Sequence, residues 1–318
     1  MKLRAFPWLI LIWMLAIPAW GGSSSKELLD AGRVDDAVAL LQQQIARNPQ
    51  DAAAHNLLCR AYFMMDEWDR GISACERARN LDPQNSLYYL WLGRIYGEKA
   101  DRVGFLSAAG LAKKVRTSFE RAVELAPKSW EARSDLAEFY VDAPSIVGGG
   151  KDKAREQAEA LMPLNPGMGH WILATIAEKN KDTAGAEREH RAAIAASESG
   201  VRAWVELAIF LYHTHRYDDM EEALRHAETA RIDQAESLVD GASILVRTGR
   251  NYPLADRLLR RYLENPIEKG PAFRAYDWLG QALEKQGDRV AAAAAYRAAL
   301  GLFHNYSRAQ EGLQRVSH

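Results

Sequence analysis

The chain has 318 residues, of which 48% are hydrophobic and 26% are charged, proportions typical of a folded protein rather than a disordered one. Lysine and arginine number 41 against 42 aspartate and glutamate, which gives a net charge of -1. Since this balance offers no basic excess to a phosphate backbone, nucleic acid is not expected as the main partner.

The first 21 residues have the layout of a secretory signal peptide. Lys2 and Arg4 give a short positive region, and residues 5–20 after it carry no charged side chain. This apolar stretch is shorter than the roughly 20 residues that a membrane-spanning helix needs, although an uncleaved anchor stays open as an alternative. We predict a signal peptide over residues 1–21, cleavage after Gly21, and a protein that is periplasmic, if the source is bacterial, or secreted.

From residue 25 onward, an amphipathic pattern recurs at a nearly constant period. Small Cys59 and Gly71, for example, stand where two antiparallel helices would touch, with the large Tyr62 beside them. Proline ends such runs because it cannot continue a helix. Four dipeptides at separations of 34, 44 and 39 residues mark these ends: Asn48-Pro49, Asp82-Pro83, Ala126-Pro127 and Asn165-Pro166.

This pattern resembles the tetratricopeptide repeat (TPR), a pair of antiparallel helices that recurs every 34 residues. The resemblance covers roughly residues 25–316. It implies an all-α fold in which about seven to eight helical hairpins stack into a right-handed superhelical solenoid over residues 22–316. Residues 305–316 are interpreted as a polar closing helix that covers the exposed end of the stack.

Two insertions lengthen the turn between the helices of two successive repeats, at residues 97–110 and 143–151. Adjacent repeats place these turns at the same edge, so we expect two neighbouring loops that either bind a partner or simply tolerate added length. The second insertion is no phosphate-binding loop, because Ser145 and Asp152 stand where that motif needs Gly and Ser or Thr. The candidate insertion-loop residues are Ile146, Gly148, Gly149, Gly150 and Lys151.

The sequence carries no recognisable motif for catalysis or for metal binding. His213 and His215 are two residues apart on one expected helix, so they do not face each other, and no third ligand is spaced to join them. We therefore predict a protein without enzyme activity and without a cofactor or metal.

The two cysteines, Cys59 and Cys75, fall on the two helices of one expected hairpin. The repeat register places them about one turn from opposite each other, whereas a disulfide needs the two Cα atoms within roughly 7 Å. We expect two buried free thiols, with a bridge as the alternative.

In the TPR family, the first helix of each hairpin lines a concave groove. By this resemblance, Asn56, Arg60 and Arg94 form the basic end of a groove that grips a carboxylate, since Arg can hold one through two parallel hydrogen bonds. The alternative is that both arginines make local ion pairs. The predicted partner-binding residues are Asn56, Arg60, Phe63, Arg94, Trp171, Ile209 and Tyr212, and the same register adds Glu138 to the groove.

These observations lead to a functional expectation. The protein is expected to be a non-catalytic scaffold or assembly factor of the cell envelope, gripping a peptide or helix of another protein in the concave groove. Two alternatives stay open: a self-associating TPR protein, or an accessory subunit of an envelope enzyme complex. Membrane contact is expected only if the N-terminal segment is uncleaved.

Overall fold

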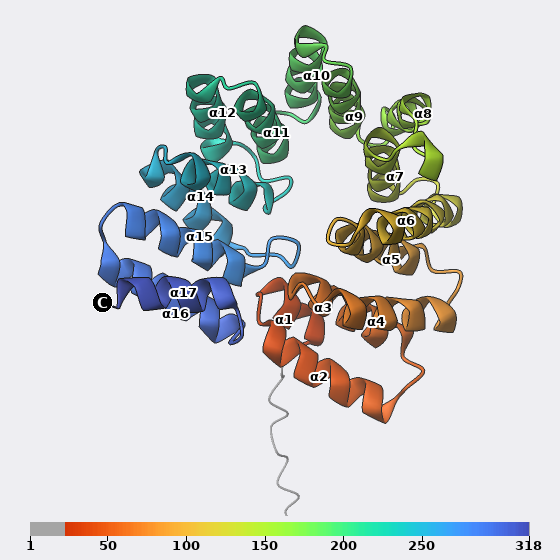
Figure 1. Cartoon of the computed structure of the whole chain (residues 1–318), viewed down its shortest axis with the longest axis horizontal. Coiled ribbons are helices and arrows are strands. Elements are labelled where there is room, and N and C mark those ends of the chain that lie inside the picture. The colour runs from red at the N-terminus through yellow and green to blue at the C-terminus, as the bar shows by residue number, and fades with distance from the viewer. Residues whose placement is uncertain (1–22, 318) are drawn as a thin grey trace, which may run out of the picture.

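The computed structural model describes residues 23–317, and this part of the chain is almost entirely helical (Figure 1). The predicted signal peptide lies outside the described residues. Seventeen α-helices follow one another: α1 (Ser25–Asp30), α2 (Val34–Arg47), α3 (Ala52–Met64), α4 (Trp68–Leu81), α5 (Ser86–Ala100), α6 (Phe105–Leu125), α7 (Trp130–Asp142), α8 (Lys151–Leu161), α9 (Pro166–Lys179), α10 (Thr183–Ala196), α11 (Val201–His213), α12 (Tyr217–Thr229), α13 (Ser237–Thr248), α14 (Tyr252–Glu264), α15 (Ala272–Lys285), α16 (Arg289–Leu302) and α17 (Ser307–Val316).

Consecutive helices pack as antiparallel pairs, from α3 with α4 to α15 with α16, and the all-α prediction is confirmed. Polar caps start many of these helices. The side chain of Asp51 accepts a hydrogen bond from the Ala54 N–H at 2.9 Å, and Ser129 does the same for Ala132 at 3.2 Å. Each cap pairs a backbone N–H that has no partner inside the helix, so a new hairpin begins directly after the proline that ended the previous one.

Small residues allow the two helices of a pair to approach closely. A Cβ placed on Gly93 of α5 would lie 2.4 Å from the Phe119 ring of α6, and one on Gly280 of α15 would lie 2.6 Å from the Tyr296 ring of α16. Both distances are far inside van der Waals contact, so only glycine permits this packing. Small residues therefore stand where the two helices of a repeat touch, next to the large residues that fill the space beside them.

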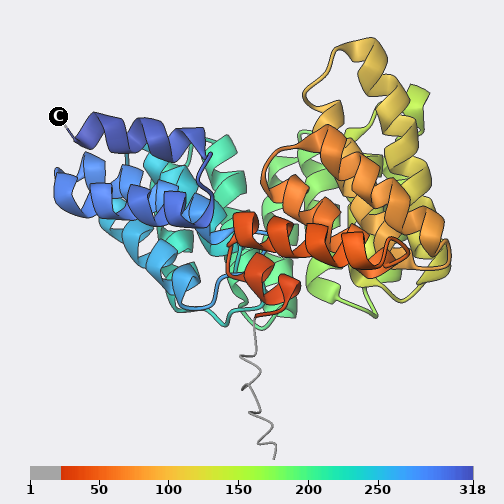
Figure 2. The same cartoon turned by 90° about the horizontal axis from the view of Figure 1, so that it is seen from below.

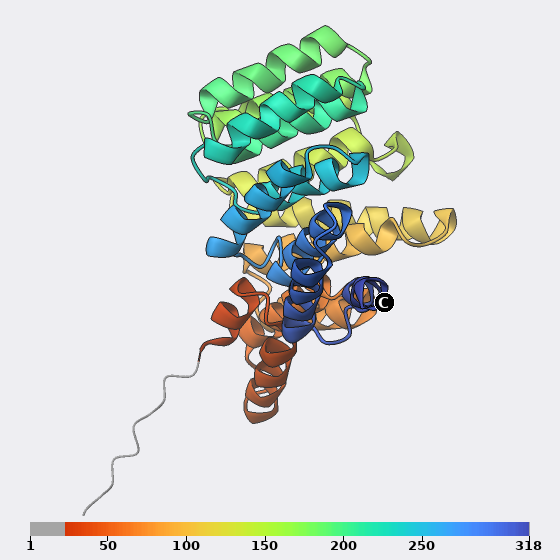
Figure 3. The ribbon, with the colours of Figure 1, turned by 90° about the vertical axis from the view of Figure 1, so that its left-hand side faces the viewer.

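The first insertion differs from its prediction. Residues 97–110 are mostly helical, because α5 continues to Ala100 and α6 begins at Phe105, leaving only 101–104 between them. The expectation of a loop was wrong here, since this stretch is rich in helix-forming residues and has no proline to stop either helix. The extended α6 is 21 residues long and projects beyond the neighbouring helices (Figure 3).

The second insertion does form a loop. Between α7 and α8, residues 143–150 contain a single 3-10 turn, η1 (Ser145–Val147), that packs against α6. The two inserted segments are thus neighbours, as predicted, although one is a helical extension and the other a loop.

The two ends of the stack meet, so that the helices form a ring (Figures 1 and 2). One buried apolar cluster draws its members from α1–α3 and from α15–α17 together. Asp35 of α2 contacts His304 at 2.6 Å, and Arg274 of α15 contacts Asp66 at 2.7 Å. Contacts between residues more than 200 positions apart therefore close the solenoid on itself.

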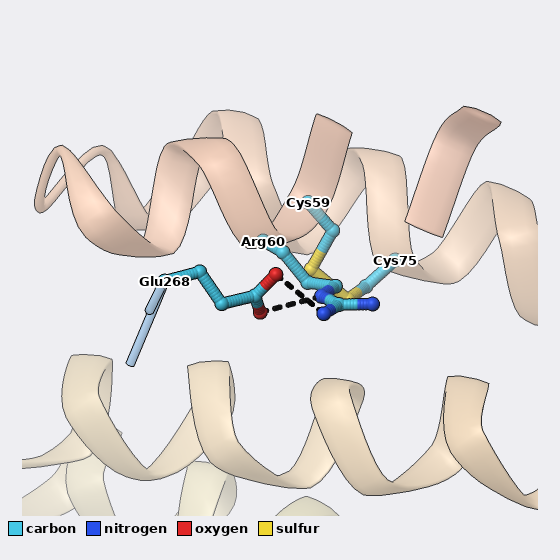
Figure 4. The surroundings of a disulfide bond; sticks show 4 residues. All are labelled: Cys59, Arg60, Cys75 and Glu268. Carbon is cyan, nitrogen blue, oxygen red and sulfur yellow. Dashed lines mark hydrogen bonds and ion pairs between the residues drawn. A yellow bond between two sulfur atoms is a disulfide. The ribbon is translucent and has the colours of Figure 1, made fainter. Parts of the chain in front are cut away.

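The expectation of free thiols was wrong. Cys59 of α3 and Cys75 of α4 form a disulfide, with their Cα atoms 5.1 Å apart, and both side chains are fully buried (Figure 4). The two positions face each other across the hairpin, and a Cα separation of 5.1 Å is well within bridging range.

Candidate partner-binding site on the inner face of the ring

The inner face of the ring is formed largely by the first helix of each pair. Figure 1 shows α7, α9, α11 and α13 nearer the centre than the helices with which they pair. The connection between α14 and α15, residues 265–271, also points toward the centre. Its Lys269 lies 3.6 Å from Glu131 of α7 and 4.0 Å from Glu236, so this loop reaches across to other repeats.

Arg60 on α3 already holds a carboxylate, and that carboxylate belongs to the chain itself. Its Nε donates to Glu268 of the 265–271 loop at 2.6 Å, and its Nη2 makes a second, shorter bond to the same carboxylate (Figure 4). The two side chains are only 13% and 7% exposed. Arg60 thus holds a carboxylate through two hydrogen bonds, as expected of a carboxylate clamp, but the carboxylate is that of Glu268 and not that of a partner.

Arg94 on α5 is also paired with a carboxylate of the chain, through a single hydrogen bond. Its Nε donates to Asp135 of α7 at 2.6 Å, and Arg94 and Arg60 lie on the ring of Trp91 at 4.9 and 5.0 Å. Loss of hydration would lower the pKa of Arg94, but Asp135 raises it above its usual value, so the guanidinium stays charged. Both arginines therefore make ion pairs within the chain, as in the alternative above, but with carboxylates 208 and 41 positions away rather than with local ones.

The remaining predicted groove residues are dispersed. Asn56 is buried, and its side-chain nitrogen has no partner among the described residues. Trp171 on α9 lies beneath the Arg202 guanidinium at 4.4 Å. Ile209 and Tyr212 are partly buried against the core of the α11–α15 region. Of the predicted residues, Phe63 and Arg94 line one pocket and Trp171 lines another.

An open pocket instead lies where the inserted segments meet the inner face. Its volume is about 530 Å³, within the usual range for ligand sites. Phe63 of α3 lies at one side of it and packs edge-on against Trp91, with ring centroids 5.5 Å apart. The other lining residues are Gly93, Arg94, Gly97, Glu98, Ala100, Asp101, Ala108, Ala109, Ala112, Val115, Phe119, Asp135, Glu138, Phe139, Asp142, Ala143, Pro144, Ile146 and Val147.

Glu138 of α7 gives this pocket an unusual carboxylate. Its side chain is exposed and lines the pocket. Loss of hydration, reinforced by Asp135, Asp142 and Glu206, raises the pKa of Glu138 to about 7. Among the described residues it makes no ion pair, so its charge near neutral pH responds to whatever enters the pocket.

The glycine run beside the pocket shapes the loop rather than presenting an anion site. A Cβ on Gly149 would lie 1.8 Å from the Ala143 carbonyl oxygen, so only glycine fits there. The Gly150 N–H donates to the Tyr140 carbonyl at 2.8 Å, and the Lys151 ammonium donates to the Asn180 side chain at 2.6 Å. Gly148 ends the 3-10 turn with a left-handed backbone, at φ 101°.

Sequence comparisons decide the family of this chain. Two family models, each described as a tetratricopeptide repeat, match residues 28–95 and residues 239–309. The chain is a tetratricopeptide-repeat protein. A search of curated protein sequences finds no match.

Comparison with solved structures gives three examples. Yeast Tom70 superposes with a TM-score of 0.53 at 14% identity, over 95% of this chain and 66% of Tom70. A TPR protein of Parabacteroides merdae gives 0.48 at 12% identity, over 92% of this chain and 96% of that one. The Thermus thermophilus protein TTC0263 gives 0.49 at 17% identity, over 59% of this chain and all of its own. At 14% identity, the likeness to Tom70 shows the fold alone.

Two further features of this TPR ring bear on its chemistry. No three His, Cys, Asp or Glu side chains within residues 23–317 lie close enough together to hold a metal ion. In the same part of the chain, no helix has both the length and the apolar composition that crossing a membrane requires.

Sequence reasoning missed two elements of the site. The loop 265–271 lies outside the repeat register, and no signal in the sequence links Glu268 to Arg60. The carboxylates of Glu98, Asp101 and Asp142 could have been found, because α5 and α7 continue the same inner-facing positions into the insertions.

Proposed function

We propose that this TPR protein is an exported, non-catalytic scaffold or assembly factor that binds a segment of another protein in the pocket formed by α5, α6, α7 and residues 143–147. TPR proteins bind other proteins in general, which gives the class of function. The observation that carries the proposal is the pocket itself, where both inserted segments and the inner face of the ring come together.

We prefer the pocket to the two arginines as the binding site because both arginines are already paired within the chain. Arg60 and Arg94 are each committed to a carboxylate of this chain and are shielded from solvent. A partner would have to displace Glu268 or Asp135 to reach them, which leaves a charge buried without its pair. The pocket needs no such displacement.

Two observations support export. The N-terminal residues carry the charge, apolar core and small residues of a signal peptide. The Cys59–Cys75 disulfide suits an oxidising compartment, where such bonds persist.

The proposal is tested by site-specific photo-crosslinking. A benzoylphenylalanine replaces Ile146 at the pocket rim, where this side chain is 81% exposed, and the purified protein is irradiated in an extract of the source organism. Val290 on α16 is 83% exposed and far from the pocket, so the same substitution there is the matched control. An adduct of defined mass is expected from position 146 and not from position 290.

A blocking variant separates pocket binding from contact with its rim. Ala109→Trp places an indole within the pocket lining and is expected to abolish the position-146 adduct, while circular dichroism checks that the helices are retained. An adduct that persists in this variant would place binding elsewhere. An adduct of twice the mass of the chain would favour self-association.

A further inference from the structure

The pocket combines an apolar interior with an excess of negative charge. Val115 and Phe119 of α6, Phe139 of α7 and Val147 of the loop supply apolar surface, and the alanines of α6 keep the space between them open. Ile146 stands exposed at the rim. Val115, Phe119 and Val147 are otherwise buried, so the pocket has an apolar floor with one exposed apolar side chain at its rim, which favours an occupant with apolar side chains of its own.

The charges around this surface do not balance. Five carboxylates and one guanidinium line the pocket. Arg94 neutralises Asp135 at 2.6 Å, and Lys179 lies 2.8 Å from Asp142. The carboxylates of Glu98, Asp101 and Glu138 have no ion-pair partner among the described residues, so three unpaired carboxylates face one pocket, and Glu138 carries its full charge only above about pH 7.

From this geometry we infer that the occupant of the pocket is a partner segment that presents a lysine or arginine beside apolar side chains. The inference rests on the proposed function and names the chemistry of the partner. An anionic segment would be repelled by three carboxylates, and a purely apolar one would strip them of water without compensation. A cationic head on an apolar stem satisfies both the walls and the interior of the pocket.

Glu138 makes this binding depend on pH. The charged groups that face it are Asp135 and Asp142 on its own helix, Arg94 and Glu98 on α5, and Arg202 and Glu206 on α11. The pKa of Glu138 is raised to about 7, and an entering cation favours its ionised form. Binding therefore releases a proton at lower pH, so affinity should fall as the pH drops through 7.

The test uses two matched peptide probes, acetyl-Leu-Lys-Leu-Leu-Lys-Leu-amide and its counterpart with glutamate in place of lysine, each carrying a neutral dye. Anisotropy titration of the purified protein is expected to show binding of the lysine probe at least tenfold tighter than the glutamate probe. Glu138→Gln should weaken the lysine probe about fivefold, the effect of losing one partly screened charge contact. It should also flatten the pH dependence between 6 and 8. Glu159→Gln removes an exposed carboxylate on α8, outside the pocket lining, and should change nothing.

The outcomes separate this inference from the proposed function. Equal binding of the two probes, tighter binding of the glutamate probe, no binding of either, or no effect of Glu138→Gln would each overturn the cationic occupant. None of these would remove a crosslink from position 146. Loss of that crosslink would overturn the proposed function itself, whatever the probes do.

Discussion

Two consecutive residues, Cys59 and Arg60, make contacts of very different range. The disulfide joins Cys59 to a residue 16 positions away in the same hairpin, while Arg60 pairs with Glu268, 208 positions away (Figure 4). Because the covalent bond fixes α3 against α4, it also fixes the starting point of the Arg60 side chain. The disulfide thus helps to position an ion pair that joins the two ends of the stack.

The first prediction concerns the disulfide. Cys59→Ala/Cys75→Ala should lower the free energy of unfolding by about 3 kcal/mol. The disulfide joins residues 16 positions apart, and closing a loop of this length reduces the entropy of the unfolded chain by about that amount. Urea unfolding with and without a reducing agent measures the effect, and the agent should leave the double variant unchanged. Thiol counting on the denatured, unreduced protein should find none. Two reactive thiols per chain would contradict the bond.

At the residue scale, sequence and structure agree where the repeat supplies a template. The small residues at helix crossings and the proline turns were predicted, because every hairpin must satisfy the same packing. The partner of Arg60 was not, since Glu268 lies in a connection that no repeat position describes. The disulfide was missed because a register of whole helical turns is too coarse to decide a Cα separation of 5.1 Å.

At the scale of single elements, the inserted segments show what a repeat pattern leaves undetermined. The repeat pattern locates an insertion because the next repeat begins later than expected. The local helix propensity then decides whether the added residues form a loop or lengthen the helices. Residues 97–110 follow propensity and extend α5 and α6, whereas Pro144 and the glycines at 148–150 keep the second insertion irregular. The pocket exists because one segment projects and the other folds against it.

The second prediction tests the loop through two adjacent glycines. Gly149→Ala should destabilise the loop by about 2 kcal/mol or more, because its Cβ would lie 1.8 Å from the Ala143 carbonyl oxygen and the backbone must move. Gly150→Ala meets nothing closer than the Lys153 side chain at 4.0 Å, in an extended backbone that any residue adopts, so it serves as the matched control. Hydrogen exchange over residues 143–150 gives the measurement. Equal exchange in the two variants would show that the close approach is absent.

At the scale of the whole molecule, the closure of the ring could not be predicted from the sequence. Each repeat contributes a small rotation to the stack, and whether the first and last repeats meet depends on the sum of these rotations. Once they meet, α1–α3 and α15–α17 share one apolar cluster, so neither of these inner end surfaces is left for stacking on another chain. Closure also fixes the shape of the inner face in the free protein. Less conformational entropy is then lost when a partner binds.

The last prediction concerns the ion pair that crosses the ring. Glu268→Gln leaves the Arg60 guanidinium, only 13% exposed, without its carboxylate, and breaking such a buried pair costs about 3 kcal/mol. Amide protons of residues 265–271 should then exchange roughly a hundredfold faster, since each 1.4 kcal/mol is a factor of ten. Hydrogen exchange followed by mass spectrometry measures this, together with the radius of gyration in solution, which should rise if the ends separate.

Two controls make that result specific to the buried pair. Arg60→Met/Glu268→Leu removes both charges and fills the space with apolar side chains, so protection of the loop should return close to its original level. Asp30→Asn breaks the exposed Lys26–Asp30 pair, whose side chains are 56% and 36% exposed, and should change protection by less than about 1 kcal/mol. If Glu268→Gln exchanges like the original protein, the shared apolar cluster alone holds the ring closed. If residues 265–271 exchange as fast in the apolar double variant as in Glu268→Gln, the uncompensated charge is not the cause of the faster exchange. The pair would then stabilise the loop through its directed hydrogen bonds.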